Sequence, residues 1–223
     1  MFKAIIIGGT GATGKQLLIQ LIRNQNCELV TSIGRRPVLD GEKNDKLVDI
    51  VVESLFQLTA TEKYWKDNDV FFNCIGTTRQ RAGGSKEFIN IEFGISNEAA
   101  KMAANAKIPH ASLISAKGAN HKIWAKDWIH PLLYMKTIGQ KEQTIISNFS
   151  FNSVSIFKPG MLIRLQGKQT RFEEFIELKG FGLRVDILAS AMIHDAERVK
   201  LGLVKESPQY FIGNNHIKSS LIL

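Results

Sequence analysis

Ser115 and Tyr134 are the residues whose chemistry best suits proton transfer to a carbonyl oxygen. A phenol can donate a proton to an oxygen that becomes negative, and a serine hydroxyl beside it can orient the same oxygen. Each residue also has an ordinary explanation, because a serine that ends a strand or a tyrosine on a helix is often structural. Their order in the chain, after a glycine-rich turn that suits a redox cofactor, makes a catalytic pair an alternative equal to the structural explanation.

That turn follows the apolar run 5–7 and precedes residues 16–23, whose apolar side chains recur with helical spacing. The pattern predicts a strand, a tight turn and a helix. Glycines at such a turn let a pyrophosphate approach backbone N–H groups at the helix N-terminus, where the helix dipole favours negative charge. Two registers remain open, G-x-G-x-x-G from Gly9 and G-x-x-G-x-x-G from Gly8. The predicted dinucleotide contacts here are Gly8, Thr10, Gly11, Ala12, Thr13 and Gly14.

The same glycines have two alternative explanations. A glycine-rich turn between a strand and a helix can serve packing alone. Gly9, Gly14 and Lys15 also match most of a nucleoside-triphosphate loop, but Gln16 stands where a serine or threonine would bind magnesium. A phosphoryl-transfer enzyme is therefore a further alternative, which rests only on Gly14 and Lys15.

Two arginines indicate which dinucleotide is bound. The second strand, expected over 28–33, ends before Arg35 and Arg36. An acidic residue in this region would accept from the adenosine ribose of NAD, whereas guanidinium groups bind a 2′-phosphate. The arginines predict NADP(H), although they could also simply be solvated. Asp49, at the end of the third strand, either accepts from the adenine amino group or is a solvated acid.

Apolar runs that alternate with helical segments predict a single α/β domain over residues 1–223, with a doubly wound parallel sheet. A further amphipathic segment at 53–66 is expected to be helical. The expected strands cover 5–7, 28–33, 47–51, 69–76, 110–115, 154–157 and 209–212, and the longer helices 86–107, 132–148 and 185–198.

Composition excludes several functions. The net charge is +8, but the basic residues are scattered and not interleaved with aromatic residues, so no nucleic-acid partner is expected.

Cys27 and Cys74 lie in apolar surroundings and are expected in the core. His121 and His130 lack a carboxylate cluster, so no metal site is predicted; their segment could form a lid or a wall of the substrate pocket. No apolar stretch is long enough for a transmembrane segment, and the expected location is cytoplasmic.

Six segments together carry a resemblance to the Tat-interacting protein family of atypical short-chain dehydrogenase/reductases, which includes fungal mitochondrial proteins. The resemblance implies an NADPH-binding Rossmann fold, with NADP(H) held at the glycine turn, Arg35, Arg36, Ile75, Gly76 and Tyr134. It also implies regulatory protein partners, and a mitochondrial surface or nuclear location as alternatives. The segments are 8–15, 33–36, 76–79 with 82–83, 115–119, 133–136 and 157–160.

One departure from the family pattern bears on activity. Short-chain dehydrogenases carry a lysine four residues after the tyrosine, which lowers the phenol pKa and holds the nicotinamide ribose, but this chain has Ile138. Lys136 lies about 200° around the helix and Lys141 about 10 Å along it, so neither is expected to replace the missing lysine. Two hypotheses follow: an NADPH-dependent oxidoreductase that acts on a small carbonyl substrate, or a catalytically weak NADPH-binding regulatory protein.

Overall fold

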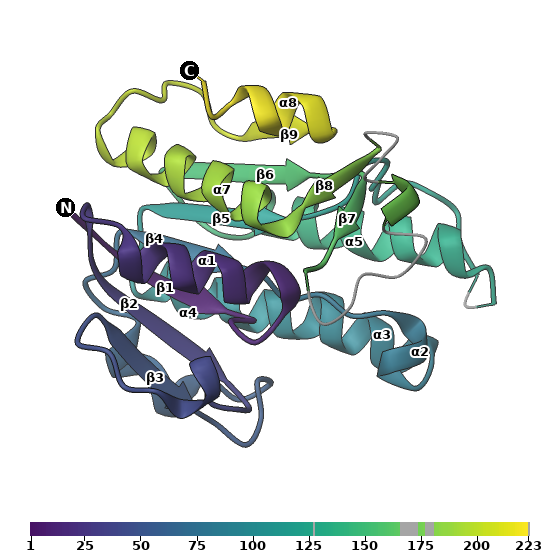
Figure 1. Cartoon of the computed structure of the whole chain (residues 1–223). Helices are drawn as coiled ribbons and strands as arrows, with labels where there is room; N and C mark the ends of the chain where they lie inside the picture. Colours follow the sequence, from purple (N-terminus) through teal and green to yellow (C-terminus); the bar gives the residue numbers. More distant parts are fainter. Residues whose placement is uncertain (127, 166–173, 177–180, 223) are drawn as a thin grey trace.

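The computed structural model describes residues 1–126, 128–165, 174–176 and 181–222. Among them, seven strands form one parallel sheet with the order β3-β2-β1-β4-β5-β6-β9 (Figure 1). The strand order reverses between β1 and β4, where open α/β sheets bind ligands. The strands are β1 Phe2–Ile7, β2 Cys27–Gly34, β3 Leu47–Val51, β4 Val70–Asn73, β5 His110–Ile114, β6 Ser153–Lys158 and β9 Gln209–Ile212.

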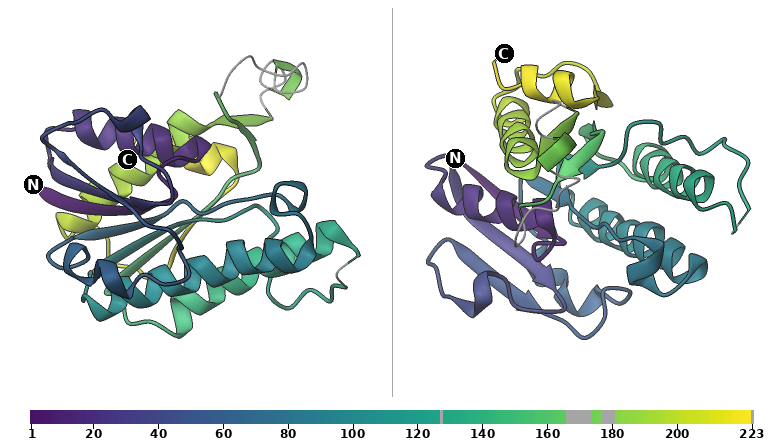
Figure 2. Two further views of the ribbon diagram at one scale, coloured as in Figure 1. Left: turned by 90° about the horizontal axis from the view of Figure 1, so that it is seen from below. Right: turned by 45° about the vertical axis from the view of Figure 1, so that its right-hand side comes forward.

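Helices cover both faces of this sheet, which confirms the predicted doubly wound α/β fold. Helices α1 and α7 pack against each other on one face, while α4 and α5 cover the other (Figure 2). A π-helical segment, η3, precedes α4. The bounds are α1 Ala12–Arg23, α2 Arg79–Ala82, α3 Ser85–Ile89, η3 Asn90–Ile95, α4 Ser96–Asn105, α5 His130–Ser147, α7 Val185–Lys200 and α8 Asn214–Ser219.

The core consists of two apolar layers, one on each side of the sheet. Along β1, Ile6 belongs to the layer under α1 and α7, whereas Ile5 and Ile7 belong to the layer under α4 and α5. Phe72 and Phe71 of β4 divide in the same way. Successive side chains of a strand point to opposite faces, so strands buried on both faces need continuous apolar runs.

Two segments differ from the prediction. The helix expected over 53–66 is only a 3-10 helix, η2, at Thr59–Tyr64. Its apolar residues do not make a long amphipathic stripe: Leu55 and Leu58 are buried but Phe56 is 49% exposed. A small parallel pair of β7 Met161–Ile163 and β8 Gly182–Arg184 was not predicted, because three-residue strands carry too little periodicity to recognise.

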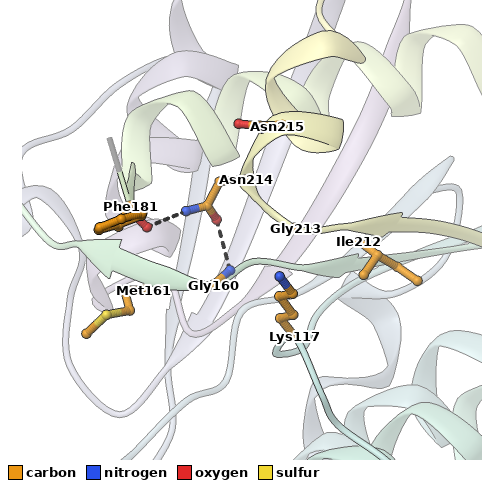
Figure 3. A pocket seen from close by; sticks show the side chains of 8 residues that line it. All are labelled: Lys117, Gly160, Met161, Phe181, Ile212, Gly213, Asn214 and Asn215. Atoms are coloured by element: carbon orange, nitrogen blue, oxygen red, sulfur yellow. Dashed lines mark hydrogen bonds between the residues drawn. The ribbon is translucent and has the colours of Figure 1, made fainter. Parts of the chain in front are cut away.

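Asn214 attaches this small sheet to the rest of the domain. Its side chain accepts from the Gly160 backbone N–H at 2.9 Å and donates to the Phe181 carbonyl at 2.7 Å (Figure 3). The three residues that these bonds join line a hollow of about 470 Å³. Lys117, Met161 and Ile212 also line it. No helix in the described part of the chain combines the length and the apolarity needed to cross a bilayer.

Candidate functional site

The turn between β1 and α1 leaves little room for side chains at its glycines. Gly8 has φ +89°, and a Cβ there would lie 2.6 Å from the Cys74 carbonyl oxygen. A Cβ on Gly14 would lie 2.1 Å from the Gly8 carbonyl oxygen. Gly11 donates its N–H to that same oxygen at 3.0 Å and is the N-cap of α1. The close approach of β1 to α1 therefore requires glycine at these positions.

The N-terminus of α1 is suited to an anion. Its first turn contains no acidic residue, and no side chain caps it. The first N–H groups of a helix lack partners within the helix, and the dipole gives this end a partial positive charge. A bound anion such as a pyrophosphate would therefore be favoured at this helix end.

A cavity of about 680 Å³ extends from this turn to the carboxyl ends of β4 and β5. It brings together most of the predicted site residues, although they come from several separate segments. The predicted residues that line it are Gly8, Thr10, Gly11, Ala12, Thr13, Arg35, Arg36, Ile75, Gly76, Ser115 and Tyr134.

Gly14 and Asp49 are the predicted residues outside this lining. Gly14 acts through the close packing described above. One Asp49 carboxylate oxygen accepts the Val38 N–H at 2.9 Å, and partial burial raises the pKa of this carboxyl group. Asp49 therefore fixes the turn that follows Arg35 and Arg36. The exposed guanidinium groups of these arginines stand at the end of β2, beside the cavity.

Tyr134 projects into the other end of the cavity from the first half of α5. Its ring packs against Phe88, with 5.8 Å between centroids, and against His130, at 6.5 Å. Burial, together with the negative charge of Glu92, raises the pKa of Tyr134 to about 12, although Arg164 opposes the shift. The phenol is consequently a protonated donor at neutral pH.

Ser115 belongs to a buried polar cluster that sequence reasoning missed. Its hydroxyl donates a short hydrogen bond to the Glu142 carboxylate. The Lys158 ammonium, at the end of β6, contacts the same carboxylate at 2.7 Å and the Ala119 carbonyl at 3.1 Å. While Ser115 donates to Glu142, its oxygen can only accept from a ligand.

Lys141, which is not expected to replace the missing lysine, also lines the cavity. Helical side chains lean toward the N-terminus, so a long lysine recovers much of the axial distance. Ile138 lines the cavity too and is 3% exposed, whereas Lys136 is outside the lining. The lysine position of the family pattern is therefore apolar, but the cavity still contains a lysine.

Among the residues of the segment 121–130 that the structure describes, none lines this cavity. Trp124 and Trp128 are 64% and 71% exposed, so they are not part of a wall of this cavity, and a role of the segment as a lid stays a prediction. Within the described ranges no group of metal-binding side chains gathers. Cys27 and Cys74 are buried free thiols, as predicted, and burial raises their pKa values to about 11 and about 12.

Solved structures share the fold of this chain. Gre2 from Candida albicans, solved in complex with NADPH, has a TM-score of 0.72 and 16% identity, over 96% of this chain and 78% of that one. The oxidoreductase ylbE from Lactococcus lactis has a TM-score of 0.67 and 15% identity, over 99% and 95%. At such identities the match establishes the Rossmann-type fold alone.

Other proteins have a higher sequence identity to this chain than these solved structures have. HTATIP2 from Rattus norvegicus is 30% identical over 83% of this chain and 72% of its own length. FMP52, a mitochondrial protein of Lodderomyces elongisporus, is 38% identical over 80% of this chain and 70% of its own. The match to FMP52 of Meyerozyma guilliermondii, 31% identical, spans 65% of that protein. No protein-family model matches the chain. The resemblance noted in the motifs is thus confirmed: the chain belongs to the family that contains HTATIP2 and the FMP52 proteins.

Proposed function

We propose that the cavity binds NADP(H). The support is one observation: a single cavity joins a glycine cradle at a bare helix N-terminus to two arginines at one end and to a tyrosine and a serine at the other. The α1 N-terminus would hold the pyrophosphate, and Arg35 and Arg36 the 2′-phosphate. Ile75, Gly76 and Tyr134 would border the nicotinamide half.

We further propose that the protein reduces the carbonyl group of a small substrate. The nicotinamide, when bound, supplies a hydride for the carbonyl carbon. Tyr134 would donate its phenolic proton to the carbonyl oxygen, a role its high pKa leaves intact at neutral pH. Ser115 would orient that oxygen after its hydroxyl turns away from Glu142.

A second candidate is an NADPH-binding regulatory protein that acts through protein partners. Ile138 favours it, because no lysine stands one turn beyond Tyr134 to lower the phenol pKa.

For the location of the protein, we propose a mitochondrial rather than a cytoplasmic one, because the names of the FMP52 relatives describe them as mitochondrial.

Calorimetric titration with NADPH and NADH tests the cofactor assignment, and NADPH oxidation with a panel of aldehydes and ketones separates the two candidates. Saturable uptake of NADPH with turnover would support the oxidoreductase. Uptake without oxidation of NADPH at any pH would favour the regulatory protein. Absence of saturable uptake would refute both.

A further inference from the structure

Lys141 and Glu92 form a buried ion pair in the wall of the cavity. The Lys141 ammonium lies 3.2 Å from the Glu92 carboxylate, and the two side chains are 1% and 2% exposed. The ammonium also donates to the Ile75 carbonyl at 2.9 Å. The other Glu92 oxygen accepts the Thr77 N–H at 2.6 Å. Together the pair fixes the chain on both sides of Gly76, where it leaves β4.

Glu92 is an unexpected group in this place, because the cavity is suited to a polyanion. Both Glu92 and Lys141 line the cavity, and the charge of Glu92 is close enough to raise the pKa of Tyr134. Glu92 lies on the π-helical segment η3. Such π-helical turns occur often at functional sites, since the extra residue changes where side chains point.

The position of Lys141 on α5 explains how its charge reaches the site. Residues seven positions apart on a helix differ by only about 20° in direction, so Tyr134 and Lys141 lie on one stripe. Ile138 lies on the same side of the helix, and all three residues line the cavity. Ile138 therefore occupies the position at which short-chain dehydrogenases carry a lysine, and the buried Lys141 follows almost one helical turn later.

We infer that Lys141 is a positioning residue for the nicotinamide half of the site: it neutralises Glu92 and holds the Ile75–Thr77 segment that follows β4, and so makes the cavity acceptable to an anionic dinucleotide. This inference rests on the proposed function. Lys141 acts through Glu92 and the Ile75 carbonyl, not as a direct ligand of the carbonyl substrate. A buried carboxylate without its partner would repel the phosphates and would keep its desolvation cost.

Opposite charge changes in the pair should have opposite effects on NADPH binding. Lys141→Met keeps the length of the side chain but leaves Glu92 unpaired, and we expect the Kd for NADPH to rise by about tenfold or more. Glu92→Gln keeps the acceptor for Thr77 but leaves the Lys141 cation, and we expect equal or tighter binding. The double variant Glu92→Gln/Lys141→Met should recover most of the loss.

Lys136→Met is the matched control, because it removes a lysine from the same helix outside the cavity lining. We expect its Kd to stay within about twofold of the wild type. Thermal unfolding of each variant, without nucleotide, reports whether it folds. If Lys141→Met fails to fold, Glu92→Gln and the double variant still carry the comparison.

The outcomes separate this inference from the proposed function. If the wild-type protein takes up no NADPH, both are overturned. If the wild type binds NADPH but Lys141→Met binds like Lys136→Met, the Lys141 inference alone is overturned. It is also overturned if Glu92→Gln weakens binding, or if the double variant is no better than Lys141→Met, because both results would indicate a purely structural role.

Discussion

At the scale of single residues, the proposed roles in cofactor binding and proton donation fall at the two ends of the cavity. Arg35 and Arg36 line it just after β2, and Tyr134 lines it from α5. The Tyr134 ring is held in place by its contacts with the rings of Phe88 and His130. Substitutions at the two ends should therefore affect different measured quantities.

Tyr134→Phe should abolish NADPH oxidation, by about 100-fold or more, because it removes the proton donor but keeps the ring. The Kd for NADPH should change little. Single-turnover assays with calorimetry measure both quantities. A variant that retains the wild-type rate would exclude Tyr134 from proton transfer.

Replacing Arg35 and Arg36 together with alanine should weaken NADPH binding by about 10- to 100-fold, because charge-assisted hydrogen bonds to the 2′-phosphate are lost. NADH, which lacks that phosphate, serves as the internal control and should bind almost as before. Equal losses for the two nucleotides would contradict the assignment.

The pH dependence of turnover follows from the high pKa of Tyr134. Since burial raises it to about 12, the phenol stays protonated at neutral pH and should cause no loss of activity up to about pH 10. Ile138→Lys adds a cation near the phenol, which favours the phenolate and should move an alkaline loss of activity to lower pH. If the defect of the site is the missing lysine, the rate near neutral pH should also rise. Unchanged pH profiles and rates would show that position 138 does not control the phenol.

At the scale of elements, the turn between β1 and α1 depends on an approach too close for any side chain. Gly14→Ala would place a Cβ against the Gly8 carbonyl oxygen, a backbone atom that cannot move away easily. We expect a loss of about 1–3 kcal/mol in the free energy of unfolding, the usual cost of overpacking, and weaker NADPH binding.

Gly34→Ala is a suitable control for the stability measurement, because the nearest heavy atom to its Cβ would be 3.4 Å away. Urea unfolding compares the two variants. Equal stabilities would show that the turn can open without cost.

The sequence predicted the elements whose signals are local and repeated. Continuous apolar runs ended by glycines marked the strands of the parallel sheet, and the glycine spacing marked the cradle. It did not show that Lys141 would line the cavity, because the axial rise of a helix alone does not give the direction of a long side chain. Glu92, Glu142 and Lys158 carried no signal, because no local pattern shows that a charged residue will be buried beside a partner from another element.

At the scale of the whole molecule, the parallel strands of the sheet run in one direction, so that their carboxyl ends lie at the same end of the sheet (Figure 1). The cavity lies at that end. A nucleotide in the cavity would contact turns after β1, β2, β4 and β5. Ligands that bind only the folded state raise stability by mass action, about 2.7 kcal/mol at 100 times the Kd. NADPH at that excess should raise the midpoint of thermal unfolding by about 5–10 °C. NADH at the same concentration should raise it less, and equal shifts would contradict the preference for NADPH.

Consecutive residues of α5 fasten this helix to two strands that are not neighbours. Lys141 bonds to the chain just after β4, while Glu142 pairs with Lys158 of β6, and β5 lies between them. Detachment of this middle part of α5 would break both the Lys141–Ile75 hydrogen bond and the Glu142–Lys158 salt bridge. Its amide protons should therefore exchange with deuterium only when the whole sheet opens, whereas those of the first turn, near His130, should exchange through local fraying.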